Sequence, residues 1–403
     1  MDPIISILIC LTAAVLIGEF LSIFKIPRVV GQILAGIILG IPFLKEIVFD
    51  SASLSIISSL ADVGVILLLF FTGLEVNFRR FIGNLKIASG ISFWNTTIPL
   101  ALGYLVSHYL FGLSNSISFI IGVALSVSAT ALALDLLEEL NLLKSKFGSL
   151  MVGAGAVDDV YELIIITLAV SFIESVGAKT AVINLIYSAL MFAVLVLAFR
   201  LIIAPITLRL IEKENEPILL TTGLILTLLM ASLSKYLGFG TLIGALISGI
   251  VVRQAMLKHS HEKMHKHPHH ISGDIRLVAF GFLVPIFFVY VGILTNVSAI
   301  FDNLLFGLII TAIAIFGTVI GCAIGYSIAK GKWRDGILMG WGLTGKGDTE
   351  IVIATLALES GIINDVLFSS LIFMAVITTL VGPLMFRYLL TNRHIKQIKT
   401  PGV

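Results

Sequence analysis

Two adjacent aspartates lie inside an apolar segment, in the sequence GAGAVDDVYELI at 153–164. Glu162 follows Asp158 and Asp159 by about one helical turn, on the same side of the predicted helix. An ionised carboxylate in the middle of a membrane span is costly unless it faces a cavity, a partner or an ion. Because neighbouring residues on a helix point about 100° apart, one aspartate can face a substrate path while the other faces another helix. Gly153 and Gly155 are expected to let the broken helices described below approach closely.

Carboxylates arranged in this way can bind either a proton or a hard cation. Repulsion between neighbouring carboxylates favours proton binding, and carboxylate oxygens also suit Na⁺ or Li⁺. Competition between a cation and a proton for one carboxylate is by itself an exchange mechanism. A structural acid bonded to a serine or a lysine is the alternative for a single aspartate, but the adjacent pair Asp158 and Asp159 favours ion binding.

The composition predicts that the solvent of this chain is a lipid bilayer. Of its 403 residues, 58% are hydrophobic and 12% are charged, with a mean hydropathy of +1.09, whereas soluble domains carry about twice that charged fraction. A net charge of +2 argues against a nucleic-acid partner. Cys10 and Cys322 both lie in apolar runs, which predicts neither a disulfide framework nor a cysteine metal site. No cofactor is expected.

The hydropathy pattern predicts an all-α polytopic membrane protein. A spanning helix needs about 20 mostly apolar residues. Loops are short, so 1–403 is expected to form a single transmembrane unit without a separate soluble domain. Thirteen spans are predicted, at 3–23, 28–44, 56–75, 88–111, 117–139, 148–172, 182–208, 217–236, 240–257, 276–296, 303–329, 334–359 and 365–390.

The distribution of lysine and arginine predicts the orientation of these spans. Basic residues concentrate in the loops that follow the odd-numbered spans and in the C-terminal tail, whereas the opposite side holds only Lys45, Lys179 and Lys235. Since the basic side of a membrane protein faces the cytoplasm, we expect an N-terminus outside the cell membrane and a cytoplasmic C-terminus.

The two halves of the chain resemble each other. VVGQILAGIILG (29–40) is similar to FGTLIGALISGIV (239–251), FFTGLEVN (70–77) to FVYVGILTN (288–296), and LSVSAT (125–130) to LTGKGD (343–348). Seven spans separate the partners of each pair, so they point in opposite directions through the membrane. This pattern is typical of inverted-topology transporters. It predicts six spans, a linker and six spans: repeat one at 3–172, a linker helix at 182–208 and repeat two at 217–390.

The third pair of segments predicts two discontinuous helices. Ser126, Ser128 and Thr130 are small and polar at mid-depth, and Thr344–Glu350 combines two glycines with five polar side chains. Irregular backbone is tolerated at that depth only inside protein or beside water, and half-helix ends carry partial charges. Within the second break Lys346 and Asp348 are candidates to neutralise the partial charges of the half-helix ends, and Glu350 is a further charged residue in the same segment.

Six stretches carry a resemblance to a known family: IPRVVGQILAGIILG (26–40), LLLFFTGLEVNFRRF (67–81), SVSAT (126–130), GAGAVDDV (153–160), VPIFFVYVGIL (284–294) and GLTGKGDTEIVIA (342–354). In this combination, over nearly its whole length, the chain resembles the monovalent cation:proton antiporter superfamily. The resemblance is to the second family, of bacterial and archaeal sodium/proton antiporters and glutathione-gated potassium-efflux systems.

The resemblance implies a thirteen-helix fold built from two domains. A dimerisation domain would comprise roughly 3–44 and 182–257, which makes a homodimer the expected assembly. A mobile core domain of roughly 56–172 and 276–390 would hold two crossed broken helices and move as an elevator, exposing the site to each side in turn.

The resemblance also implies roles for individual residues. Asp159 matches the principal carrier of ion and proton, and Asp158 matches the additional acid of the two-aspartate, typically electrogenic members. With Ser128 and Thr130 of the first break they form the predicted ion site, so the expected function is exchange of Na⁺ (or Li⁺) for H⁺. The short tail after the last span lacks the nucleotide-binding domain of the potassium-efflux relatives.

Three departures from the family pattern concern charge balance. Electrogenic relatives often carry a lysine in the span that corresponds to 303–329, where this chain has no internal cation and Thr318 is the best match. Lys346 is the candidate replacement, in a Lys346-Gly347-Asp348 sequence where the family usually has Arg-Gly-Glu. Glu162 stands where many relatives have an apolar or small residue, so a third titrating group is expected there.

Other readings of the sequence remain open at this stage. Six histidines of a cytoplasmic loop titrate near neutral pH and could sense it, although a solvated polar loop is an equal reading. K⁺/H⁺ antiport is the alternative within the family. Asp348 in a G-x-G-D pattern, facing Asp158 or Asp159, is the arrangement of an intramembrane aspartyl protease, and a sodium-coupled organic solute symporter is a third class. The histidines are His259, His261, His265, His267, His269 and His270.

Overall fold

The structure is a computed structural model whose regular elements, among the residues that it describes, are helices. These residues are 2–24, 26–75, 85–128, 133, 136–137, 140, 142, 145, 147–155, 157–158, 161, 165, 190, 193–194, 197, 201, 216–236, 240–260, 277–330, 332–347 and 349–391.

The chain divides into two compact units, each built from segments that are far apart in the sequence. Unit 1 comprises Met1–Leu16, Gln32–Val76 and Val170–Gly292, and unit 2 comprises Ile17–Gly31, Asn77–Ala169 and Ile293–Val403. The helices α1 (Pro3–Ile23), α2 (Arg28–Leu39) and α14 (Val284–Leu294) have residues in both units.

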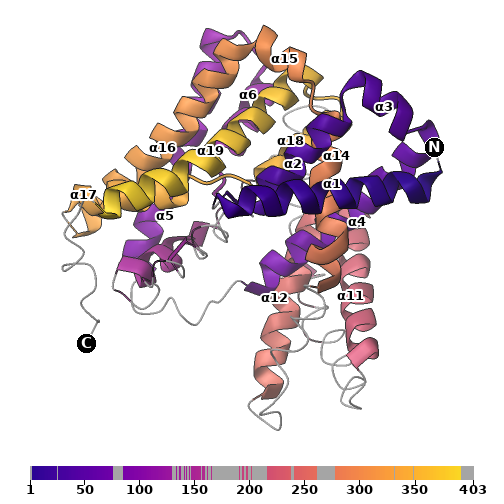
Figure 1. Cartoon of the computed structure of the whole chain (residues 1–403). Coiled ribbons are helices and arrows are strands. Elements are labelled where there is room, and N and C mark those ends of the chain that lie inside the picture. The colour runs from indigo at the N-terminus through magenta and orange to yellow at the C-terminus, as the bar shows by residue number, and fades with distance from the viewer. Residues whose placement is uncertain are drawn as a thin grey trace. The chain divides into compact units, whose positions relative to one another are not determined.

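Unit 1 contains four further helices. They are α3 (Pro42–Val48), α4 (Ser51–Glu75), α11 (Glu216–Tyr236) and α12 (Gly240–Ser260), with a π-helical turn at Ala279–Leu283 before α14. The neighbours α11 and α12 lie side by side, and α12 packs along α4 (Figure 1).

Unit 2 contains seven helices beyond the shared ones, among the residues that are described. Its centre is α16, which packs against α5, α17 and α19 (Figure 1). The seven are α5 (Leu85–Leu105, continued by a π-helical turn at Val106–Leu110), α6 (Asn115–Ser126), α15 (Val297–Asp302), α16 (Leu304–Lys330), α17 (Trp333–Leu343), α18 (Thr349–Glu359) and α19 (Asp365–Thr391).

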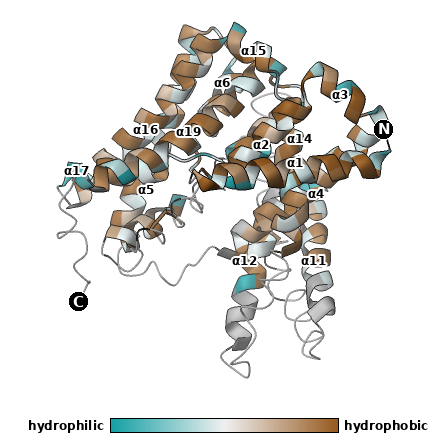
Figure 2. Cartoon of the chain, viewed as in Figure 1, coloured by the Kyte–Doolittle hydropathy of each residue, from teal (hydrophilic) through white to brown (hydrophobic). Residues whose placement is uncertain are grey.

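Several of these helices have the length and apolarity of membrane spans. Four qualify in the described part of the chain, within α1, α4, α16 and α19, and α2 with α3 forms a fifth candidate, bent by 87°. Figure 2 shows that α1, α16 and α19 are mostly brown, which marks apolar residues along their length. The spans predicted at 148–172 and 182–208 lie largely outside the described residues.

Two close glycine contacts in unit 1 join equivalent pairs of helices, α2 with α14 and α4 with α12. A Cβ on Gly36 of α2 would lie 2.8 Å from the Cα of Gly292 on α14, and a Cβ on Gly73 of α4 would lie 3.1 Å from the Cα of Gly249 on α12. Both pairs join the second helix of one predicted repeat to the third helix of the other. Such backbone approach is possible because glycine has no side chain.

In unit 2 a second set of glycines brings α16 against α5. Gly317, Gly321 and Gly325 recur every four residues and so line one face of α16. That face meets α5 at Pro99, Asn95 and Ile91: a Cβ on Gly321 would lie 2.9 Å from the Cα of Asn95 and would also collide with the backbone oxygen of Trp94. Small residues at such positions let membrane helices pack backbone to backbone.

The helical path is interrupted where the glycine-rich sequence predicts a break. The helix α17 ends at Leu343, and α18 begins at Thr349. At the first end, the Thr344 hydroxyl donates to the carbonyl of Gly340 at 2.7 Å. At the second, Glu350 lies in the first turn of α18, where the positive end of the helix dipole favours a carboxylate. In the other half of the chain, α6 ends at Ser126 and Val127 is extended.

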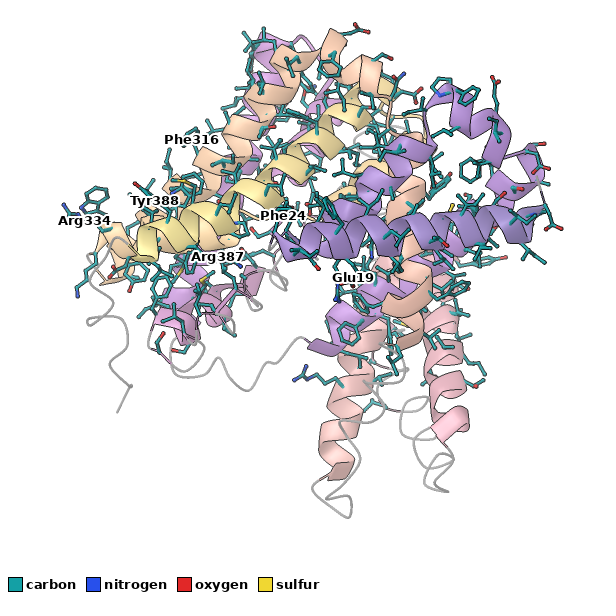
Figure 3. The ribbon with its side chains drawn as sticks, viewed as in Figure 1. Glu19, Phe24, Phe316, Arg334, Arg387 and Tyr388 are labelled. Carbon is teal, nitrogen blue, oxygen red and sulfur yellow. The ribbon has the colours of Figure 1, made fainter. Side chains whose placement is uncertain are left out.

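Basic and aromatic side chains gather where α17 begins and α19 ends. Figure 3 shows Arg334 of α17 at the same end of unit 2 as Arg387 and Tyr388 of α19. The Arg334 guanidinium lies over the ring of Trp333, 5.7 Å from its centroid. Trp333 and Tyr388 are exposed, as is common for aromatic residues at a membrane–water interface.

Prediction for the α5–α16 contact. We expect Gly321→Ala to lower the thermal unfolding temperature, because its methyl group would collide with the backbone of Trp94 and Asn95 and overpacking costs about 1–3 kcal/mol. Gly90→Ala on α5 is the matched control, since a Cβ there meets nothing within 4 Å. Differential scanning fluorimetry of the purified protein in detergent measures both. Equal unfolding temperatures for the two variants would contradict this packing.

Candidate functional site

Asp158 is fully buried in unit 2 and accepts hydrogen bonds on both carboxylate oxygens. The hydroxyls of Ser92 and Thr96 donate to its Oδ1 at 2.6 and 2.9 Å. The amide Nδ2 of Asn95 donates to its Oδ2. Because an ionised carboxylate can only accept hydrogen bonds, this shell of donors suits the charged form.

All three donors come from one face of α5. Ser92, Asn95 and Thr96 are spaced i, i+3 and i+4, so they lie together on the helix surface. The helical stretch that carries Asp158 packs on the same face, where a Cβ on Gly153 would lie 3.6 Å from the Cβ of Ala88. Gly153 therefore faces α5, whereas the sequence suggested that it would face the broken helices.

Asn95 extends the network to two further segments. Its Nδ2 also donates to the Ser128 hydroxyl at 3.2 Å, just beyond the end of α6. The thiol of Cys322 on α16 donates to its Oδ1 at 3.3 Å. The predicted residues Asp158 and Ser128 are thus brought together through a side chain that the sequence analysis did not select.

Lys346 is buried at the second helix break and reaches the first. Its ammonium donates to the carbonyl of Val127, which directly follows the end of α6. A cation is favourable there because the C-terminal end of a helix carries partial negative charge. The Thr379 hydroxyl donates to the Lys346 carbonyl. Lys346 also interacts electrostatically with Asp158.

Two further predicted residues have defined positions. Thr318 is buried on α16, one turn before Cys322, and its hydroxyl makes no hydrogen bond within the described part of the chain. Glu350 is buried in the first turn of α18.

Several sequence predictions fall outside the described residues. Asp159, Thr130, Glu162 and Asp348 are among them, so their predicted roles stay predictions. His259 belongs to the last turn of α12, but its side chain is not described. The other five loop histidines, His261, His265, His267, His269 and His270, lie outside the described residues as well.

The α5 side of the site was not predicted from the sequence. Ser92, Asn95 and Thr96 occur in SFWNTT (92–97), a polar cluster inside an otherwise apolar helix. Three hydrogen-bonding side chains at i, i+3 and i+4 in a membrane span are the signal that would have found them.

The fold and the site together define a class of protein. Long apolar helices, a helix break at mid-span and a buried carboxylate beside a buried lysine are features of secondary ion transporters. The chain belongs to the sodium/hydrogen exchanger family, whose transmembrane model matches residues 7–392.

Two similar proteins have names that match this family. The chain is 28% identical to a Na⁺/H⁺ antiporter of Enterococcus hirae over 95% of its own length and 97% of that protein. It is 25% identical to the Na⁺/H⁺-K⁺ antiporter GerN of Bacillus cereus, over 90% of this chain and 89% of GerN.

A solved structure is similar over almost the whole chain. The sodium proton antiporter MjNhaP1 from Methanocaldococcus jannaschii superposes with a TM-score of 0.72 at 16% identity, covering 95% of this chain and 96% of MjNhaP1. This likeness shows that the chain has the helical antiporter fold. The expectation of a sodium/proton antiporter is thereby confirmed at the level of the family, and the protein is a secondary transporter rather than an enzyme. The intramembrane protease reading of Asp348 is therefore wrong.

Prediction for the Asp158 hydrogen bonds. We expect Asp158→Leu to be much less stable than Asp158→Asn. Leucine leaves the buried donors of Ser92, Asn95 and Thr96 without their acceptor, at about 1–3 kcal/mol for each unsatisfied group. Asparagine can accept from Asn95 and donate to a hydroxyl. Thermal unfolding in detergent compares the two variants, and equal stability would mean that these bonds contribute little to the fold.

Proposed function

We propose that the protein is a secondary active antiporter that exchanges Na⁺ (or Li⁺) for H⁺ across the cell membrane. Cation and proton compete for Asp159, with Asp158 as the second acid of the pair. The observation that carries the proposal is the fully buried Asp158 carboxylate, held by neutral donors beside a helix break. Neutral donors satisfy its lone pairs but leave its charge to be balanced by a cation or a proton.

The oxygen atoms around the first helix break complete the proposed ion site. The Ser128 hydroxyl lies in the same hydrogen-bond network as Asp158, and Thr130 follows it in the sequence. Carboxylate and hydroxyl oxygens are suitable ligands for a hard cation such as Na⁺. Glu162, four residues after Asp158, is proposed as an additional titrating group.

Lys346 is the proposed charge-balancing residue. It takes the place of the lysine that electrogenic relatives carry in the span corresponding to α16, where this chain has Thr318. Its contact with the Val127 carbonyl and its interaction with Asp158 support this role. Asp348 and Glu350, in the same break and the following turn, are proposed to offset its charge.

Transport is proposed to follow an elevator movement of a core domain, roughly 56–172 and 276–390, against a dimerisation domain of roughly 3–44 and 182–257. The two compact units support this assignment in part. Unit 2 holds 77–169 and 293–390 of the proposed core, whereas 56–76 and 276–292 lie in unit 1 with most of the dimerisation segments, and 17–31 lies in unit 2. An inverted repeat within a fold of about thirteen spans is supported by the paired contacts Gly36–Gly292 and Gly73–Gly249 in unit 1. The working assembly is a homodimer in the lipid bilayer, with its C-terminus in the cytoplasm.

Potassium is the second candidate cation. The name of one relative, GerN, supports this candidate, because that name includes K⁺ beside Na⁺. Both cations would use the same carboxylates, so the site is the same and only its size preference differs.

Prediction for the carrier. We expect purified protein in proteoliposomes to move protons when Na⁺ or Li⁺ is added, and Asp159→Asn to abolish this movement, because an amide cannot exchange a proton. Asp62→Asn on α4 is the matched control: it neutralises an exposed acid that belongs to unit 1, whereas Asp158 belongs to unit 2. A fluorescent pH probe inside the vesicles follows the reaction. If Asp159→Asn moves protons at the wild-type rate, Asp159 is not the carrier. If K⁺ drives faster proton movement than Na⁺, potassium is the transported cation.

Prediction for the stoichiometry. With two carboxylates titrating, we expect more than one proton to leave for each Na⁺ that enters, so that net positive charge leaves the vesicle. An interior-positive membrane potential should then accelerate Na⁺ entry, and an interior-negative one should slow it. The same proteoliposomes, clamped with an ionophore at opposite potentials, give the measurement. Rates that do not depend on the potential would indicate electroneutral exchange and a single titrating aspartate.

A further inference from the structure

The side chain of Asn95 makes hydrogen bonds through both its amide nitrogen and its carbonyl oxygen. Its carboxamide offers two N–H donors on Nδ2 and an acceptor oxygen. Nδ2 donates to Asp158 Oδ2 and to Ser128 Oγ at 3.2 Å, and Oδ1 accepts from Cys322 Sγ at 3.3 Å. This buried residue of α5 is therefore bonded to three other segments of unit 2.

The chemistry of its neighbours fixes the orientation of this carboxamide. A flipped amide would turn its carbonyl oxygen toward the Asp158 carboxylate, and two acceptors would then face each other in a buried site. In the observed orientation the carbonyl oxygen instead meets the Cys322 thiol, a weak donor. Cys322 reaches it because α16 approaches α5 backbone to backbone at Gly321, the preceding residue.

The two oxygens of Asp158 are held in different ways. Oδ1 accepts from two hydroxyls, Ser92 and Thr96, whereas among the described residues Oδ2 accepts from Asn95. Asn95 is thus the described group that holds Oδ2. The same Nδ2 atom also holds the Ser128 hydroxyl, so one amide group sets the separation between two oxygens that belong to different segments.

We infer that Asn95 is a positioning residue that holds Asp158 Oδ2 and Ser128 Oγ at a fixed separation and thereby sets the sodium affinity of the exchange. This inference rests on the proposed function. Cation coordination depends steeply on the distances between ligand oxygens, and ligands that are already in place lose little freedom when the ion binds. Asn95 itself does not exchange a proton, so its loss should weaken cation binding more than turnover.

The first experiment measures the KM for Na⁺ and the maximal exchange rate in proteoliposomes for wild type, Asn95→Leu and Asn95→Ser. Leucine keeps the approximate shape of the side chain and removes all its hydrogen bonds, and serine keeps a small polar group if leucine prevents folding. We expect a KM about tenfold higher, as for one lost hydrogen bond to a charged group, with a maximal rate within about threefold of wild type. Thr97→Val is the matched control, because Thr97 lies two residues after Asn95 on α5 and takes part in none of the hydrogen bonds of this network.

A second pair of variants tests the orientation of the amide. Cys322→Ala removes the donor to Asn95 Oδ1, whereas Cys322→Ser replaces it with a hydroxyl donor of similar size. We expect the KM for Na⁺ to rise about threefold in the alanine variant and to return toward the wild-type value in the serine variant. A role of Cys322 in packing alone predicts no such rescue.

The outcomes separate this inference from the proposed function. If wild type exchanges Na⁺ for H⁺ while the Asn95 variants change only yield, unfolding temperature or maximal rate, Asn95 is merely structural and the inference is overturned. If wild type shows no sodium-dependent proton movement, both the proposed function and this inference fail. Thermal stabilisation of the detergent-solubilised protein by Na⁺ provides an independent readout, and its concentration dependence should shift to higher Na⁺ in the Asn95 variants.

Discussion

The structure of this site depends on the cost of placing a carboxylate where water cannot solvate it. A buried charge is tolerated only when it is hydrogen-bonded and its charge is balanced. In the described part of the chain the two requirements are met by different groups. The neutral donors of α5 satisfy the oxygens of Asp158, and Lys346 contributes positive charge.

The packing of unit 2 makes this division possible. Glycines on α16 let it contact the backbone of α5, and this contact places Cys322 against Asn95. A break in the other half of the chain frees the Lys346 backbone from helical hydrogen bonding and lets its side chain reach Val127, beyond the end of α6. The donors, the acid and the lysine therefore come from four segments that are distant in sequence, each brought near by a small residue or a helix end.

The sequence predicted the parts of this arrangement that leave a strong local signal. Charged residues in apolar runs identified Asp158 and Lys346, and the Thr-Gly-Lys-Gly sequence located the helix break between α17 and α18. It did not identify Asn95, because a single amide in a membrane helix is as often a packing residue as a ligand. Nor could it identify the partners of Asp158, because which residues meet across two helices depends on the rotation and separation of those helices, here at the contact of Gly153 with Ala88. Thr318, selected by position, is buried, and its hydroxyl makes no hydrogen bond among the described residues.

The separation of hydrogen bonding from charge balance gives a physical reason for coupled exchange. Lys346 is tied to the Val127 carbonyl, and under the proposed function it compensates one negative charge when both aspartates are ionised. A site with two ionised aspartates keeps a second negative charge that neutral donors cannot remove. Moving such a site through the low-dielectric part of the membrane is costly, and a bound proton or cation removes that cost. An elevator that moves only when the second charge is balanced would carry Na⁺ in one direction and protons in the other, and it would rarely return empty.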